Sequence, residues 1–153
     1  MKIGVAQVNP TVGDLLGNLE IIQDAYCSLV QSGAELVIFP ELVICGYPPR
    51  DLLLKKNFGP DCLNALEEFS RQTTSCPALV GFPEPTNAKN SKPFYNSVAL
   101  CSNGNIGQVF RKRLLPTYDV FDEDRYFCAG ESNLHFSYLG KKIGVSICED
   151  LWN

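Results

Sequence analysis

The sequence predicts an α/β fold, with a mixed β-sheet and helices packed against it. Two observations lead there. The first half of the chain alternates short apolar runs with segments of helical periodicity, and the second half carries two hairpin signals. Parallel strands are therefore expected early in the chain, and antiparallel strands late. At 153 residues, the chain has the length of about one domain and can bury a sizeable core.

The predicted strands of the first half are short and apolar. They cover residues 2–8, 35–39 and 78–82, and the first two stop at a proline. Between them, apolar residues recur every three or four positions in residues 13–33 and 60–73, which is the spacing of one helix face. The order is therefore strand, helix, strand, helix, strand.

The second half of the chain is expected to form two hairpins. Residues 95–101 and 106–111 are strand-like, and the Asn-Gly pair between them supports the positive φ angles of a tight turn. Residues 134–138 and 142–147 form the second predicted pair. The sequence thus adds antiparallel pairs to the parallel part of the sheet.

The remaining segments are predicted as loops. Residues 41–55 contain glycine and proline, with a helix expected to start at Asp51. Residues 83–93 are polar and rich in breakers, so they are expected to form a surface loop. Residues 114–131 are aromatic and charged and show no clean periodicity.

Composition excludes several classes of protein. The net charge is −4 and there is no basic face, which disfavours nucleic acid or an anionic membrane as partner. Apolar stretches are far shorter than the ~20 residues that a membrane span needs, and the N-terminus lacks the features of a signal peptide. The seven cysteines are widely spaced without a CxxC pair, which argues against a disulfide framework or a structural zinc site. A reducing, cytoplasmic location is expected.

Three reactive side chains each follow a predicted strand: Glu41, Lys112 and Cys148. Open α/β sheets place ligand crevices at such strand ends. Singly, Glu41 and Lys112 are best explained as surface charges, and Cys148 as a core residue or a nucleophile. Together they supply a thiol, a base and a positive group for a developing oxyanion, which is what thiol attack on an amide needs.

Other chemistries have weaker support. The single histidine, His135, lies within a predicted strand and is expected to be a packed or surface residue rather than a base. The acidic run 122–124 is interpreted as a solvated turn, with Mg²⁺ binding as the alternative. The sequence contains no GxSxG, GxGxxG or GxxxxGK[ST] motif.

Three blocks of the sequence resemble a known family. These are FPELVICGYPPRDLL (39–53), FRKRLLPTYDVFDEDRYF (110–127) and GVSICEDLWN (144–153). They are similar to the three catalytic blocks of the nitrilase, or carbon–nitrogen hydrolase, superfamily. More narrowly, together with the opening MKIGVAQVNPTVGDLLGN, they resemble the N-terminal glutaminase domain of glutamine-dependent NAD⁺ synthetases.

The resemblance implies a fold and a set of roles. The fold would be the nitrilase-like α-β-β-α sandwich, with a mixed sheet and helices on the outer faces. Glu41 would be the general base and later the acid, and Lys112 would stabilise the tetrahedral intermediate. Cys148 would be the nucleophile, and Tyr118 would help to bind the substrate, L-glutamine. No metal or cofactor is implied for this segment.

The resemblance also implies a larger enzyme. Residues 1–153 would be the N-terminal portion of the glutaminase domain, incomplete at its C-terminal end. Ammonia would pass to a C-terminal synthetase domain, which uses ATP and Mg²⁺ to amidate deamido-NAD⁺, and the enzyme would be a homo-oligomer. Two alternatives stay open: a free-standing nitrilase-like amidase, and an inactive, truncated binding or assembly module.

Overall fold

The computed structural model describes residues 1–86, 92–131 and 135–152. Its elements, with 3-10 helices written η, follow in chain order: β1 (Ile3–Val5), α1 (Leu15–Gln31), β2 (Leu36–Ile38), η1 (Arg50–Leu54), α2 (Phe58–Arg71), β3 (Ala78–Pro85), β4 (Phe94–Ser102), β5 (Asn105–Arg111), η2 (Glu123–Arg125), β6 (Phe127–Cys128), β7 (His135–Tyr138), β8 (Lys141–Gly144) and η3 (Cys148–Leu151).

The main sheet is mixed, as the sequence predicts. Its strand order is β1-β2-β3-β4-β5, and the short β6 pairs with β4. The pairs β1–β2 and β2–β3 are parallel, whereas β3–β4 and β4–β5 are antiparallel. The C-terminal ends of β2, β3 and β5 consequently lie at the same edge of the sheet. This edge is where Glu41 and Lys112 follow their strands.

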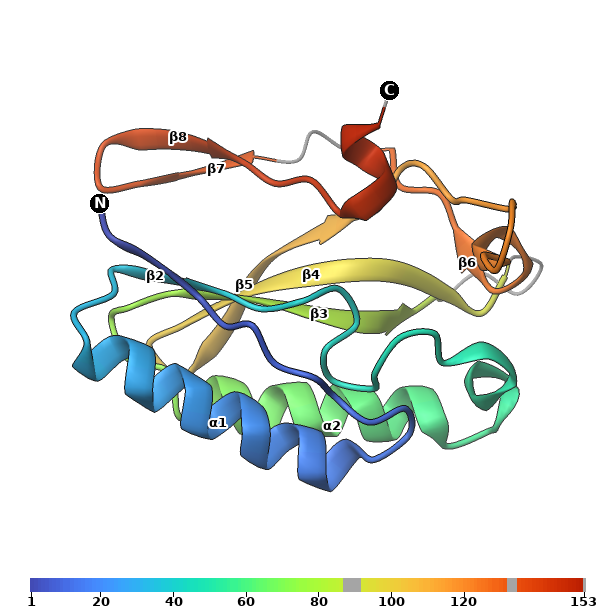
Figure 1. The fold of residues 1–153 in the computed structure, drawn as a ribbon, viewed down its shortest axis with the longest axis horizontal. Helices are drawn as coiled ribbons and strands as arrows, with labels where there is room; N and C mark the ends of the chain where they lie inside the picture. The colour runs from blue at the N-terminus through green and yellow to red at the C-terminus, as the bar shows by residue number, and fades with distance from the viewer. Residues whose placement is uncertain (87–91, 132–134, 153) are drawn as a thin grey trace.

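The molecule is layered around this sheet. Helices α1 and α2 cover one face, and the antiparallel pair β7–β8 forms a separate sheet over the other face (Figure 1). In the part of the chain that the structure describes, these are three layers of an α-β-β-α arrangement. No helix within the described ranges is both long enough and apolar enough to cross a lipid bilayer.

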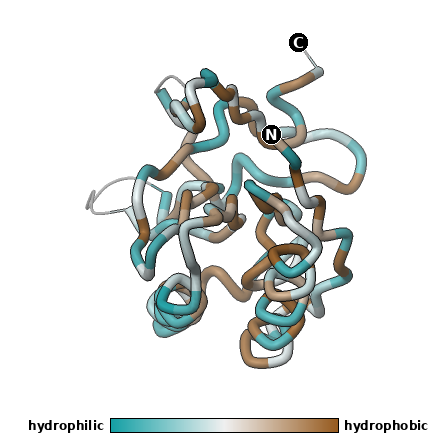
Figure 2. The backbone as a smooth tube through the Cα atoms, turned by 90° about the vertical axis from the view of Figure 1, so that its left-hand side faces the viewer, coloured by the Kyte–Doolittle hydropathy of each residue, from teal (hydrophilic) through white to brown (hydrophobic). Residues whose placement is uncertain are grey.

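Two apolar clusters fill the spaces between the layers. The larger one lies between the helices and the sheet and includes Ile22, Leu66 and Phe69, which are fully or almost fully buried. The smaller one joins the sheet to the β7–β8 pair through Phe110 and Phe136. Figure 2 shows the two helices below the sheet. Their buried residues recur at helical spacing, with Leu19, Ile22 and Tyr26 in α1 and Leu66 and Phe69 in α2, which is the amphipathic pattern that predicted the helices.

The hairpin turn between β4 and β5 confirms the Asn-Gly prediction. Asn103 and Gly104 have φ angles of +50° and +77°. Both central residues of a type I′ turn need positive φ. Helices α1 and α2 and the strands β2, β4 and β5 also lie within about two residues of their predicted bounds.

Some boundaries were predicted wrongly. Strand β1 is shorter than residues 2–8, and β8 ends at Gly144 rather than at residue 147. Strand β3 continues to Pro85, into the predicted loop 83–93, because β4 pairs with its whole length. Strand β2 pairs only with the first two residues of β3, so the later half of β3 has a free side that tolerates prolines. Residues 87–91 of that loop, and Leu134 of the second hairpin, lie outside the described residues.

Candidate active site

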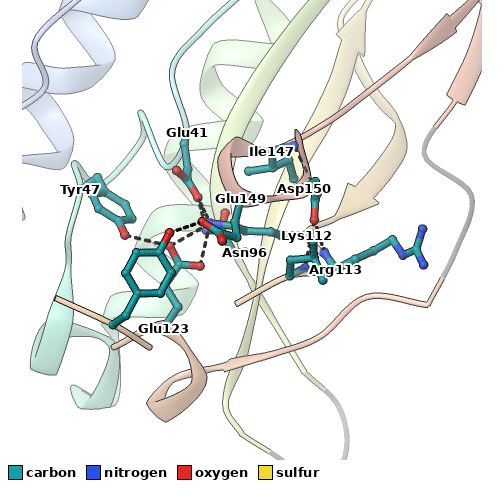
Figure 3. A network of polar contacts seen from close by, with 11 residues as sticks. Glu41, Tyr47, Asn96, Lys112, Arg113, Glu123, Ile147, Glu149 and Asp150 are labelled. Carbon is teal, nitrogen blue, oxygen red and sulfur yellow. Dashed lines mark hydrogen bonds and ion pairs between the residues drawn. The ribbon is translucent and has the colours of Figure 1, made fainter. Parts of the chain in front are cut away.

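A polar cluster lies at the edge of the sheet where β2 and β5 end. The side chains of Glu41, Lys112 and Glu123 converge there, with Asn96 and Tyr47 beside them (Figure 3). These residues come from four separate segments of the chain, since Glu41 and Tyr47 share one loop, so the cluster exists only because the fold is formed.

Lys112 is the centre of the cluster. Its side chain is 0% exposed, and its Nζ lies 2.7 Å from Glu41 Oε1 and 2.9 Å from Glu123 Oε1. The backbone is fixed on both sides, since Lys112 N donates to the carbonyl of Asn96 and Gly130 N donates to the carbonyl of Lys112. Buried lysines need such partners, because an unpaired charge is costly to bury.

Glu41 is placed by a close backbone crossing. The loop that carries it passes directly over β3 at Gly81, where an added Cβ would lie 2.4 Å from Leu42 N and 2.7 Å from Pro40 O. Only glycine leaves room for this approach. Asn96 Nδ2 donates to Glu41 Oε1 at 2.7 Å, which fixes the orientation of the carboxylate.

Cys148 occupies a strained turn after β8. Its φ angle is +46°, a left-handed conformation that costs a non-glycine residue roughly 1–3 kcal/mol and that is found preferentially at functional sites. The residue is exposed. A cavity of about 180 Å³ is lined by both Cys148 and Glu41, together with apolar residues of the main sheet. The structure thus brings the three predicted residues together.

The electrostatics favour a neutral thiol in the resting protein. Partial burial and the negative charge of Glu41 raise the pKa of Cys148, while the positive charge of Lys112 lowers it by less. A further contribution that raises the thiol pKa comes from Glu123. A base must therefore take the thiol proton before the sulfur can attack.

The ammonium of Lys112 stays charged. Burial alone would lower its pKa, but the charges and hydrogen bonds of Glu41 and Glu123 outweigh burial and hold the pKa of Lys112 above its ordinary value. Burial raises the pKa of Glu123, and the hydrogen bond from Lys112 only partly offsets this. The cluster thus keeps a positive group beside the thiol.

Tyr118, the fourth predicted residue, contacts the residue that follows Cys148. It is 56% exposed, and its hydroxyl donates to Glu149 Oε2 at 2.7 Å. This hydrogen bond raises the pKa of Tyr118. Because Glu149 directly follows Cys148, the Tyr118–Glu149 pair stands next to the thiol and offers a carboxylate and a hydroxyl to a polar ligand.

Glu123 corrects the interpretation of the acidic run. The run was predicted to be a solvated turn, yet Glu123 is 4% exposed and bonds both Lys112 and the hydroxyl of Tyr47, at 2.8 Å. Its neighbours Asp122 and Asp124 are exposed, as predicted. Burial of the Tyr47 hydroxyl and its hydrogen bond to Glu123 raise the pKa of Tyr47.

Sequence reasoning missed Glu123, Tyr47 and Asn96. Glu123 and Tyr47 lie in the predicted loop segments 114–131 and 41–55, whereas Asn96 lies within a predicted strand and carries no signal of its own. Within residues 1–86, 92–131 and 135–152, Asn96 Oδ1 is a buried side-chain polar atom without a hydrogen-bond partner, and it belongs to the cluster. Glu123 Oε2 makes no geometrically regular hydrogen bond, but it lies 2.9 Å from Lys112 Nζ and is satisfied by this ion pair. An unsatisfied buried polar atom in a native structure calls for an explanation, and a functional role is one.

Other predicted chemistries find no support in the geometry. His135 is exposed on β7, as a surface strand residue. Among the described residues, no group of three or more His, Cys, Asp or Glu side chains could hold a metal ion, and this includes the acidic run 122–124. A second cavity, of about 400 Å³, shares Tyr47 and Glu123 with the cluster and is also lined by Tyr126.

Comparisons with known proteins identify the family of the chain. The carbon–nitrogen hydrolase family model matches residues 2–153. A glutamine-dependent NAD(+) synthetase of Synechocystis is 44% identical over 99% of this chain and 28% of its own length. The enzyme of the same name from Thermotoga maritima is 39% identical over 100% of this chain and 26% of its own length. The chain therefore spans little more than a quarter of these relatives.

Solved structures show the same fold. The glutamine-dependent NAD⁺ synthetase of Acinetobacter baumannii, in complex with ADP, superposes with a TM-score of 0.91 at 38% identity, over 98% of this chain and 28% of that one. An amidase from Nesterenkonia superposes with a TM-score of 0.78 at 22% identity, over 97% of this chain and 56% of that one. The second likeness concerns the fold alone.

Proposed function

The chain belongs to the carbon–nitrogen hydrolase family, and on that premise we propose that it hydrolyses the side-chain amide of glutamine. Cys148 is the nucleophile, Glu41 the base and Lys112 the oxyanion partner. The observation that carries this proposal is the buried contact of 2.7 Å between Lys112 Nζ and Glu41 Oε1, beside a cavity that Glu41 shares with Cys148.

The first half of the reaction forms a thioester. Glu41 takes the proton of the Cys148 thiol, whose raised pKa keeps it protonated until the base acts. The sulfur then attacks the amide carbon of glutamine, and the carbonyl oxygen becomes an oxyanion. Lys112, held positive by two carboxylates, stabilises this oxyanion. Glu41 returns the proton to the amide nitrogen, the C–N bond breaks, and ammonia leaves.

The second half releases glutamate. Glu41, again unprotonated, takes a proton from a water molecule that attacks the thioester carbon. The C–S bond then breaks, and Glu41 returns this proton to the sulfur to regenerate the thiol. The Tyr118–Glu149 pair, which is adjacent to Cys148 in the chain, suits the recognition of the substrate: the carboxylate of Glu149 complements the α-ammonium group of glutamine. The same base thus serves both halves of the reaction.

The relatives suggest where the ammonia goes. We infer that residues 1–153 are the N-terminal portion of a glutaminase domain within a longer cytoplasmic enzyme, as in the NAD(+) synthetases that the chain matches over about a quarter of their length. In that enzyme, a synthetase domain with ATP and Mg²⁺ would use the ammonia to amidate deamido-NAD⁺. Assembly as a homo-oligomer is part of the same proposal.

Replacement of Cys148 tests the proposal in the full-length protein. The Cys148→Ala variant is expected to lose NAD⁺ formation driven by glutamine and to keep NAD⁺ formation driven by ammonia. The matched control is Cys27→Ala, at an exposed cysteine of α1, which should keep both activities. Glutamine-driven activity in Cys148→Ala would refute the assignment of the nucleophile.

The same assay separates the two rival functions. A protein that hydrolyses amides, but forms no NAD⁺ from either nitrogen source, would be a free-standing nitrilase-like amidase. A protein in which Cys148 neither turns over glutamine nor reacts faster than the other cysteines with a thiol reagent would be a binding or assembly module.

A further inference from the structure

We propose that Asp150 is a positioning residue, which holds the turn of Cys148 against the loop that follows Lys112. The proposal rests on the function proposed above. The observation behind it is a single carboxylate that accepts three backbone N–H groups from two distant segments, those of Arg113, Leu114 and Ile147 (Figure 3).

One oxygen of the Asp150 carboxylate accepts hydrogen bonds from the backbone that follows Lys112, here called the lysine side of the site. Asp150 Oδ1 accepts from Arg113 N at 3.0 Å and from Leu114 N at 2.9 Å. These two residues directly follow Lys112, whose own N–H and C=O are held by neighbouring backbone. The backbone is thereby fixed at Lys112 itself and at the two residues that follow it.

The other oxygen bonds the cysteine side. Asp150 Oδ2 accepts from Ile147 N at 3.2 Å, and the backbone N–H of Asp150 donates to the carbonyl of Ile147 at 3.1 Å. Two hydrogen bonds thus join residues 147 and 150 and close the turn that contains Cys148. A left-handed residue such as Cys148 persists only where surrounding contacts over-determine its conformation. Asp150 supplies such a contact.

The consequence is a fixed distance between the nucleophile and its charged partners. Cys148 lies on the turn that follows β8, a strand of the smaller sheet. Glu41 and Lys112 follow strands of the main sheet. The two sheets could shift relative to one another without a direct link at this edge. The Asp150 carboxylate makes that link through backbone groups, so it acts on the chemistry without contacting the reacting atoms.

The chemistry of the carboxylate suggests a pair of variants. Asp150→Ala removes all three hydrogen bonds. Asp150→Asn keeps one carbonyl oxygen, which can serve either the lysine side or the cysteine side, but its amide group is a donor and cannot accept the remaining N–H groups. The matched control is Asp24→Asn, at an exposed residue of α1 on the far face of the main sheet.

Two readouts in the full-length protein test the proposal. The first is glutamine hydrolysis: kcat should fall by about 100-fold in Asp150→Ala, since a misplacement of about 1 Å can cost that much, with KM little changed. The drop in Asp150→Asn should be smaller, and Asp24→Asn should match the wild type.

The second readout needs no substrate. The pH dependence of iodoacetamide labelling is followed on the peptide that contains Cys148, by mass spectrometry. A thiol freed from Glu41 and Glu123 should titrate at lower pH, nearer to an ordinary cysteine. This shift is expected in Asp150→Ala and, more weakly, in Asp150→Asn.

The outcomes separate the two proposals. Loss of kcat together with a shifted Cys148 titration supports the positioning role. The positioning role is overturned if kcat falls while the titration of Cys148 does not move, and also if kcat is unchanged. If Asp150→Ala does not fold, the same two measurements on Asp150→Asn decide. A wild-type protein that hydrolyses no glutamine would instead refute the proposed function, whatever the titration shows.

Discussion

Lys112 Nζ lies 2.7 Å from Glu41 Oε1, and this contact joins two residues that are 71 positions apart in the chain. A third charge, on Glu123, completes the group at 2.9 Å. One ammonium between two carboxylates leaves the group with a formal charge of −1. Partial burial raises the pKa of the adjacent Cys148 thiol, and this surplus negative charge raises it further, whereas a cysteine paired with a cation alone would have a lowered pKa.

Neutralising Lys112 should affect both activity and stability. In Lys112→Met, glutamine hydrolysis is expected to fall by about 10²–10³ in kcat, as when one oxyanion donor is removed. The free energy of unfolding should drop by roughly 3–5 kcal/mol, because two carboxylates lose their buried partner. Steady-state kinetics and urea denaturation measure the two effects. The control Lys56→Met, at an exposed lysine, should change neither; a Lys112→Met enzyme with near-normal kcat would contradict the assigned role.

The acidic run 122–124 allows a buried carboxylate, that of Glu123, to be compared with two exposed ones. Glu123→Gln removes a buried charge beside Lys112, so kcat for glutamine should fall by at least about tenfold, as for a perturbed general acid–base site. Asp122→Asn and Asp124→Asn remove exposed charges from the same short run and should leave kcat unchanged. Equal effects of all three substitutions on kcat would show that the buried charge of Glu123 contributes no more to the reaction than the exposed charges of Asp122 and Asp124.

Glu41 should have opposite effects on alkylation and on turnover. Its negative charge raises the pKa of the Cys148 thiol, so Glu41→Gln should lower that pKa and shift the labelling of Cys148 by iodoacetamide to lower pH. Glutamine hydrolysis should collapse at the same time, because the base is lost. Glu20→Gln, on the exposed side of α1, is the control. A labelling curve that moves to higher pH would refute this electrostatic account.

The close crossing at Gly81 predicts a steric effect on the site. An alanine there would place its Cβ 2.4 Å from the backbone N of Leu42, so the loop that carries Glu41 must move. Gly81→Ala is expected to lower the free energy of unfolding by about 1–3 kcal/mol and to reduce kcat more than KM. The comparison variant is Gly107→Ala, on β5, where the added Cβ would lie 3.2 Å from its nearest atom. This variant should lose less of both the free energy of unfolding and kcat. A full-activity Gly81→Ala enzyme would show that the crossing does not position Glu41.

Local pattern predicted much of the fold but only part of the site. Helical spacing identified α1 and α2, and the Asn103-Gly104 pair identified the β4–β5 turn, because both signals are local in sequence. Glu41, Lys112 and Cys148 stood out as reactive residues after predicted strands. The approach of Glu41 and Lys112 could be inferred, because strands that run in the same direction end at one edge of a sheet. Cys148 follows β8 of the separate sheet, so its approach depends on how the two sheets pack.

The missed features depend on distant contacts. Glu123 lies in a run of three acids that has the composition of a solvated turn, and its burial comes from Lys112 and from Tyr47, 76 positions away. Strand β3 extends through two prolines because β4 pairs with it, which no local pattern shows. The assignment of β7 and β8 to a separate sheet likewise depends on packing against the main sheet rather than on their own sequence.

The most direct test of the central claim is to trap the covalent intermediate. The full-length protein is mixed with glutamine and quenched with acid within one turnover, and its peptides are analysed by mass spectrometry. We expect a glutamyl thioester on the peptide that contains Cys148, and none in the Cys27 peptide or in Cys148→Ala. Turnover of glutamine without any adduct on Cys148, or with the adduct on another residue, would contradict the account.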